Sequence, residues 1–486
     1  MKQLALPLLD ALEKYSKEKV VRFHMPGHKG DIDPTARIAR LFGSDIFRYD
    51  VTNIPEMDNL HQPKSVILEA ERLAAQAFGA DRTYFLINGS SCGLQALIMT
   101  VCNPGDRLLV PRNIHRSILG GIILGGVVPV YYLPCYNPEF GIPLGCSLQT
   151  IEQQLIRQSL KGVIVVNPTY HGITSDISEL ANVAHKYDVP LLVDEAHGPH
   201  LRFHEDLPLS ALEQGADGVV HGTHKLLTSF TQASMVHTKG HLIDKNRLEA
   251  VLRIIQSTST SYLLLASLDA ARQNAAINGR AMISSALERS SYISRLVNSM
   301  YGLKTLGTEI IGNCGVHGID LTKVTICFRQ LGLSGYQVES ILRDTYNIQV
   351  EMADLFNILL LITSGNTSGD MKKIAVALEQ LTKMCLKIDK PTSLFNNDVL
   401  IYPEIPEMVL SPRDAFFSPV TFSSLDKAAG RISAEIITCY PPGVPIIGPG
   451  EKITQDIVDY IRVLKATGAS FQGCNDPSLE NILVVC

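Results

Sequence analysis

Two short apolar runs near the middle of the chain each lead into a residue with a reactive side chain. Residues 189–193 precede Asp194, and residues 216–220 are followed shortly by Lys225. Both runs are rich in β-branched residues, and apolar positions in residues 180–187 recur at helical spacing, so helix and strand alternate here. Such alternation predicts the parallel sheet of an α/β fold, whose ligands bind beyond the carboxyl ends of the strands. We therefore expect Asp194 and Lys225 to share one site.

An aspartate and a lysine at one sheet edge suit the chemistry of pyridoxal phosphate. The lysine amine forms a Schiff base with the aldehyde of that cofactor, and the aspartate keeps the pyridine nitrogen protonated. A lysine that follows a strand is more often a solvated turn residue, so the prediction depends on further groups.

Those further groups follow two other strand-like runs. Residues 88–93, Asn-Gly-Ser-Ser-Cys-Gly, precede a helical run, so Ser90 and Ser91 lie where the N–H groups of a helix N-terminus bind phosphate. The same pattern also makes an ordinary helix cap. His115 follows the apolar residues 108–110, and its imidazole either stacks on the cofactor ring or forms a hydrogen-bonded turn. The joint occurrence of these groups at successive strand ends favours the cofactor site.

Residues 194–204 also suggest two other classes of site. Asp-Glu-Ala-His at 194–197 matches the Walker B form of DEAH-box helicases, but the sequence has no G-x-x-x-x-G-K-[ST] phosphate loop. His197, His200 and His204 have a spacing that suits metal binding on a helix. Pro199 indicates a loop instead, so we expect polar loop histidines and no metal.

The composition indicates an ordinary globular protein of more than one domain. The chain has 486 residues and a formal net charge of -5, which gives no indication of nucleic-acid binding. Residues 118–135 are uncharged but contain four glycines, so a helix, a turn and a strand are expected rather than a membrane span. The ten scattered cysteines predict reduced thiols and a cytoplasmic location.

Changes in sequence pattern suggest five consecutive segments. Residues 1–48 form an N-terminal arm, and residues 49–300 form the large α/β domain. Short strands and helices alternate in residues 301–388, which predicts a smaller α+β domain. A proline-rich linker is expected at 389–412, and a C-terminal segment at 413–486.

Seven sequence motifs together resemble the Orn/Lys/Arg decarboxylase class-I family of fold type I pyridoxal phosphate enzymes. The resemblance extends over nearly the whole chain. Its motifs are FHMPGHKG at 23–30, NGSSCG at 88–93, VPRNIHRS at 110–117, VDEAHGPH at 193–200, GTHKLLTSFTQAS at 222–234, TSTSYLLLAS at 258–267 and YPPGVPIIGPGE at 440–451.

The resemblance implies a role for each candidate residue. Lys225 would be the Schiff-base lysine, Asp194 the partner of the pyridine nitrogen, and His115 the stacking residue. Gly222 stands where the family often has a serine, which removes one hydroxyl from the phosphate site. The phosphate would be held by Ser90, Ser91 and His224, and by Thr258 from a second subunit, which implies a homodimer or a dimer of dimers.

The resemblance also implies decarboxylation of a basic amino acid. Lys225 is the first candidate for the acid that protonates Cα, and His197 is the second. Glu435 is the candidate carboxylate for the distal cationic group, although a solvated glutamate on a helix face is an equal alternative.

The position of the first family motif and the presence of the site residues narrow the choice of substrate and of protein class. The family motifs begin by His24, which leaves no room for the N-terminal wing of the longer members. Short biosynthetic forms favour arginine giving agmatine in polyamine biosynthesis, with lysine giving cadaverine second and ornithine third. A third class, an inactive scaffold of the same fold, is opposed by the intact Lys225 and Asp194.

Overall fold

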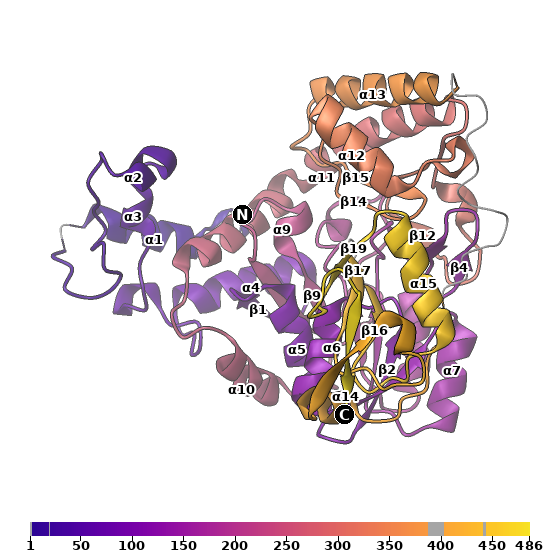
Figure 1. The fold of residues 1–486 in the computed structure, drawn as a ribbon. Helices are drawn as coiled ribbons and strands as arrows, with labels where there is room; N and C mark the ends of the chain where they lie inside the picture. Colours follow the sequence, from indigo (N-terminus) through magenta and orange to yellow (C-terminus); the bar gives the residue numbers. More distant parts are fainter. Residues whose placement is uncertain (1, 19, 387–402, 441–443) are drawn as a thin grey trace. The chain divides into compact units, whose positions relative to one another are not determined.

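The computed structural model, drawn in Figure 1, describes residues 2–18, 20–386, 403–440 and 444–486. The chain divides into two compact units. The first unit contains residues 1–101, 192–204 and 209–280, and the second contains 102–191, 205–208 and 281–486. Most of the predicted linker, and residues 441–443 of the last motif, lie outside the described residues. The five predicted segments stay a prediction.

The first unit contains four hydrogen-bonded strands in the order β1-β10-β9-β8. They are β1 (Arg82–Leu86), β10 (Ser234–Thr238), β9 (Gly218–His221) and β8 (Leu191–Asp194). As predicted, β8 and β9 are parallel, but β10 runs antiparallel to both of its neighbours. The fully parallel sheet is therefore wrong for β10, because a buried strand has the same apolar pattern in either direction.

The helices of the first unit include α5 (Gly89–Val101), which packs closely against these strands. A Cβ atom at Gly93 would lie 2.8 Å from the Leu86 side chain and 3.0 Å from that of Val220, so glycine allows the close packing of α5. The helices are α1 (Pro7–Lys17), α2 (Arg37–Phe42), α3 (Ile46–Tyr49), α4 (Val66–Phe78), α5 (Gly89–Val101), α9 (Thr223–Leu226) and α10 (Lys245–Ile255). The long helix α11 (Tyr262–Asn298) begins in this unit.

Glu71 of α4 gives the first unit a pH-dependent stability. It is buried, lies 3.0 Å from Nη2 of Arg82 and accepts a hydrogen bond from the N–H of Phe85. Burial, which outweighs the opposing charge of Arg82, raises the pKa of Glu71 from its ordinary value of 4.5 to about 7.

The folded state therefore holds a proton that the unfolded chain has released between pH 4.5 and 7. We expect the free energy of unfolding of the wild type to fall by roughly 3 kcal/mol relative to Glu71→Gln across that window. Urea titrations of both proteins at several pH values measure this difference. A difference that does not change with pH would show that the pKa of Glu71 is close to normal.

The second unit begins with three parallel strands in the order β6-β2-β3, which are β6 (Gly162–Val166), β2 (Arg107–Pro111) and β3 (Val128–Tyr132). The helices between these strands in sequence are α6 (Arg116–Gly125) and α7 (Leu148–Arg157), and α8 (Ile177–His185) follows β6. The predicted helix, turn and strand at 118–135 are confirmed by α6 and β3. None of the described helices is long and apolar enough to cross a bilayer.

A smaller α+β region follows in the second unit, as predicted for the fold class. The four-stranded sheet has the order β11-β13-β15-β14, and α12 (Gly335–Tyr346) and α13 (Ser368–Leu386) share one apolar core with it. The strands are β11 (Lys304–Thr305), β13 (Lys323–Cys327), β14 (Met352–Ala353) and β15 (Asn357–Leu361).

The remainder of the second unit has its own core around α15 (Gln455–Ala466). One three-stranded and one two-stranded sheet contribute, and α14 (Pro412–Phe417) precedes them. Their strands are β16 (Val420–Ser424), β17 (Ile437–Tyr440), β18 (Val444–Ile447), β19 (Ser470–Gln472) and β20 (Asn481–Val485). Elsewhere in this unit β4 (Tyr136–Asn137) pairs with β5 (Ile142–Pro143), and β7 (Ile173–Thr174) with β12 (Gly318–Ile319).

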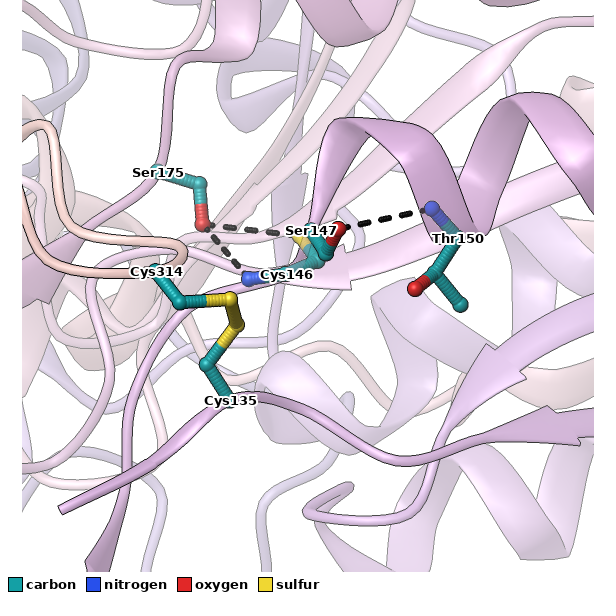
Figure 2. Close-up of a disulfide and its surroundings, with 6 residues drawn as sticks. All are labelled: Cys135, Cys146, Ser147, Thr150, Ser175 and Cys314. Carbon is teal, nitrogen blue, oxygen red and sulfur yellow. Dashed lines mark hydrogen bonds between the residues drawn. A yellow bond between two sulfur atoms is a disulfide. The ribbon is translucent and has the colours of Figure 1, made fainter.

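A disulfide corrects the prediction of ten reduced thiols. Cys135, after β3, is bonded to Cys314, at a sequence separation of 179 (Figure 2). The other eight cysteines have no disulfide bond. Figure 2 also shows Cys146, whose N–H donates to Oγ of Ser175 at 3.1 Å. The pairing was not predicted because the two cysteines meet only through the folding of distant segments.

Candidate active site

Two adjacent parallel strands place the predicted aspartate and lysine at one edge of the sheet. Asp194 is the last residue of β8 and lies in register with Val220 of β9. Gly222 is the N-cap of the short helix α9, which presents Lys225 immediately after β9. Because β8 and β9 run in the same direction, both side chains lie beyond the carboxyl ends of their strands.

Asp194 is a buried carboxylate with one oxygen still available. Its Oδ1 accepts a hydrogen bond from the N–H of Ala196 at 3.1 Å, and its Oδ2 accepts none from any described residue. Burial raises the pKa of Asp194, while the charge of Lys225 and the bond from Ala196 oppose that change. A cationic N–H group at Oδ2 would complete its coordination, and the protonated pyridine nitrogen of pyridoxal phosphate is such a group.

Lys225 and His197 form a direct polar contact. Nζ of Lys225 lies 2.8 Å from Nε2 of His197. An ammonium group can donate only to an unprotonated imidazole nitrogen, so the contact fixes Nε2 as the acceptor when Lys225 is charged. The pair is therefore arranged to exchange a proton.

The serines predicted to bind the cofactor phosphate lie at the start of α5. Ser90 and Ser91 are partly exposed in its first turn, and Gly89 has the left-handed φ of 78° that this tight entry requires. Nδ1 of His224 lies 3.1 Å from the carbonyl oxygen of Ala233. The carbonyl oxygen can only accept, so Nδ1 carries the hydrogen of this contact, and Nε2 can donate to a phosphate only when the imidazole is protonated. Burial lowers the pKa of His224, and a phosphate dianion beside it would oppose that change.

Thr258 is exposed in a loop of the same unit. The preceding residue, Ser257, donates its N–H to Oδ1 of Asn88 at 3.2 Å, directly before α5. The loop therefore lies beside the predicted phosphate-binding residues of its own chain. The reach of Thr258 into a second subunit stays a prediction.

Two details near Lys225 were not found from the sequence. A Cβ atom at Gly222 would lie 2.8 Å from the carbonyl oxygen of Ala196 and 3.1 Å from Cδ of Lys225, so a serine there would require these segments to move. The hydroxyl of Thr223 is buried and makes no hydrogen bond with any described residue. Thr223 therefore offers a polar group beside the glycine that lacks one.

A buried chain of hydrogen bonds lies next to Asp194 and was also missed. Oε2 of Glu195 lies 2.8 Å from Nε2 of His221, Nδ1 of His221 lies 3.0 Å from Nε2 of His237, and Nδ1 of His237 lies 2.7 Å from Oγ1 of Thr83. Oε1 of Glu195 accepts the N–H of Ala211 at 2.8 Å. This series of hydrogen bonds connects the residue after β8 to the last residue of β9. It therefore links the two strand ends that carry Asp194 and Lys225. Its sequence signal was three polar residues within buried strands, each of which requires a partner.

The carboxylate of Glu195 sets the direction of this chain. Burial lowers the pKa of His237 far below its ordinary value, so His237 is neutral and donates through one nitrogen only. With Glu195 ionised, each histidine donates from Nε2 toward Glu195. In Glu195→Gln the amide can donate instead, and every bond can reverse.

We therefore expect Glu195→Ala to lower the free energy of unfolding by about 3 kcal/mol or more, because His221 loses its buried acceptor. Glu195→Gln should lose less than half as much. Urea unfolding of the two variants beside the wild type provides the comparison. Equal losses of unfolding free energy in the two variants would contradict a series of hydrogen bonds whose direction can reverse.

Two predicted site residues belong to the second unit. His115 is the N-cap of α6, where Nδ1 accepts from the N–H of Ser117 at 3.2 Å. Glu435 is buried outside any helix, so the alternative of a solvated helix-face residue is wrong. Its oxygens accept hydrogen bonds from the N–H groups of Asn475 and Leu483 at 2.7 and 2.8 Å. A role for Glu435 as the distal carboxylate stays a prediction.

The stretch that suggested a metal site is a loop that ends in a short 3-10 helix, Leu201–Phe203. Within the described ranges, no group of three or more His, Cys, Asp or Glu side chains has the geometry of a metal site.

The mixed α/β fold, with an aspartate and a lysine at adjacent strand ends, defines a pyridoxal-phosphate-dependent enzyme of fold type I. Two family models match the chain. They describe the major domain of Orn/Lys/Arg decarboxylases at residues 6–370 and the C-terminal domain at 397–477. The chain belongs to the Orn/Lys/Arg decarboxylase family, and it is a decarboxylase that uses pyridoxal phosphate.

Individual relatives agree with this family. An arginine decarboxylase of Bacillus anthracis is 40% identical over 487 residues, which are 100% of this chain and 98% of the relative. The lysine decarboxylase LdcA of Pseudomonas aeruginosa is 26% identical and aligns with 96% of this chain and 77% of its own length.

Solved structures show the same fold. The Francisella novicida lysine decarboxylase LdcF superposes with a TM-score of 0.84 at 23% identity, covering 100% of this chain and 82% of that one. A serine palmitoyltransferase of Sphingomonas wittichii gives a TM-score of 0.52 at 15% identity, covering 80% and 86%.

Proposed function

We propose that this chain converts arginine to agmatine and carbon dioxide. The observation that carries the proposal is a difference in similarity among relatives. Those named arginine decarboxylase are 39–41% identical, whereas those named lysine decarboxylase are 25–26% identical. Lysine giving cadaverine is the second candidate and ornithine the third. A cytoplasmic place in polyamine biosynthesis is part of the same proposal.

Each residue of the site has a role in this reaction. Bound pyridoxal phosphate supplies an electron-accepting ring for the electron pair of the broken carbon–carbon bond. Asp194 holds the proton on the pyridine nitrogen, and Ser90, Ser91 and His224 bind the phosphate. Lys225 holds the cofactor and delivers the proton that replaces the carboxylate at Cα. His197, whose Nε2 lies 2.8 Å from Nζ, passes a proton to Lys225 to replace the one delivered to Cα, and His197 then takes up a new proton from water.

A competition experiment tests the choice of substrate. Equal concentrations of arginine, lysine and ornithine are given to one preparation, and the amines formed are separated by chromatography. We expect agmatine to exceed cadaverine and putrescine at early times, in the ratio of the kcat/KM values. A hundredfold excess of cadaverine would overturn the choice of arginine.

The assembly is a homodimer or a dimer of dimers. The exposed Thr258 supports this proposal, because its side chain is free to reach the phosphate of a neighbouring subunit. Closed symmetric dimers are the commonest assemblies of soluble proteins. We expect light scattering of the active enzyme to give at least twice the chain mass, and Thr258→Val to weaken binding of the cofactor severalfold. A fully active monomer would exclude Thr258 from the site.

A further inference from the structure

The second unit contains a cavity of about 310 Å³, within the size range of small-molecule sites. Apolar side chains such as Ile142, Met352 and Ile446 form much of its wall. None of the residues assigned above to the cofactor phosphate, the pyridine nitrogen or the Schiff base is among its lining residues.

One carboxylate in the wall is held in a fixed position. Oδ1 of Asp354 accepts the N–H groups of Phe356 and Asn357, both at 2.9 Å. Oδ2 has the side-chain amide of Asn357 at 3.0 Å and Nε2 of His171 at 3.8 Å, a distance too long for a hydrogen bond. Oδ2 therefore has room for one more donor, and the Asp354 side chain is 19% exposed.

The other charged and titratable groups of the wall do not neutralise Asp354. Nη2 of Arg112 donates to Oε2 of Glu451 at 2.8 Å, in a buried ion pair that occupies its guanidinium. Burial lowers the pKa of His171 to about 4, so its imidazole is neutral at physiological pH. Among the described lining residues, Asp354 is thus a carboxylate without a cation paired to it.

Aromatic rings surround the same space. Tyr136, Tyr336, Tyr460 and Phe356 all line the cavity. Burial, and after it the charge of Asp354, raises the pKa of Tyr136 to about 12, while the charge of Arg329, which is not among the lining residues, opposes that change. The faces of such rings attract organic cations, most strongly where water is excluded.

We propose that this cavity binds an organic amine or guanidine that lacks a carboxylate, with the cation at Asp354 and the tyrosines and its aliphatic chain along the apolar wall. An amino acid is disfavoured, because its own carboxylate would find no unpaired cationic residue in the wall. Agmatine, the product under the proposed function, belongs to the favoured class.

Binding in the cavity would act on the enzyme through the second unit. Arg112 and Asn113 line the cavity and precede His115, the predicted stacking residue, by three and two positions. A cation in the cavity therefore affects the segment that carries His115 and makes the site a means of product control. This regulatory part rests on the proposed function, whereas the binding itself does not.

Calorimetric titration of the holoenzyme with agmatine tests the site. We expect Asp354→Asn to weaken binding at least tenfold and Tyr136→Ala to weaken it severalfold. Tyr136 is 37% exposed, so we expect the variant to fold, which its circular dichroism spectrum checks. Asp344→Asn, which removes an exposed carboxylate from α12 outside the cavity, is the matched control and should bind as the wild type does.

The outcomes separate the two proposals. Agmatine binding that both cavity variants leave unchanged would overturn the cavity site. Turnover of arginine, measured on the same wild-type preparation, decides the proposed function independently. Binding that depends on Asp354 in a protein without arginine turnover would retain the cavity site and refute its regulatory role.

Discussion

Lys225→Ala is expected to give a colourless protein with decarboxylation reduced by about 10⁴-fold or more, the scale for loss of a covalent catalytic group. Lys225 is the amine at the carboxyl edge of β9, and its Nζ already has a proton partner in His197. Without it, the cofactor has no covalent attachment and no adjacent group to deliver the proton to Cα. Absorption spectra and initial rates on the purified variant measure both effects.

Lys239→Ala is the matched control for this variant. Lys239 belongs to the same unit, and its Nζ donates to the carbonyl oxygen of Leu212. We expect its colour and turnover to match those of the wild type. A yellow, active Lys225→Ala protein would show that another lysine holds the cofactor.

Asp194→Asn should retain part of the cofactor binding but lower kcat by about a hundredfold or more, which corresponds to roughly 3 kcal/mol for a preorganised charge contact. The asparagine oxygen can still accept the N–H of Ala196. Its neutral amide cannot hold a proton on the pyridine nitrogen, so the ring becomes a weaker electron acceptor.

The same substitution separates chemistry from stability. Burial raises the pKa of Asp194, so its charge costs stability above its ordinary range, and the fold of the asparagine variant should be as stable as the wild type near pH 7. Asp244→Asn, at the exposed N-cap of α10, is the control for loss of a carboxylate. Near-normal turnover of Asp194→Asn would mean that another residue holds the ring nitrogen.

The elements that carry Asp194 and Lys225 were predictable because their signals are local. A run of buried β-branched residues and a helical apolar period lie within 15 residues of each other, and both depend on neighbours in the chain. The direction of β10 was not predictable in this way. The direction of β10 depends on how the chain returns to the sheet before this strand begins. The apolar pattern of a strand contains no information about its direction.

Hydrogen bonds between polar residues that are far apart in the sequence were the part of the site that could not be predicted. Lys225 and His197 meet because β8 and β9 are adjacent, which the alternation of helix and strand suggested. The chain from Glu195 to Thr83 depends instead on the register of three strand pairs, which a single sequence does not give. The aromatic wall around Asp354 is likewise assembled from segments more than 200 residues apart.

Release of labelled carbon dioxide from carboxyl-labelled arginine is the measurement that tests the central claim most directly. The holoenzyme should release it in proportion to time and enzyme, at a higher kcat/KM than for lysine or ornithine, and Lys225→Ala should release none above background. If a yellow, folded wild-type protein released no carbon dioxide from any of the three amino acids, decarboxylation at Lys225 would be refuted.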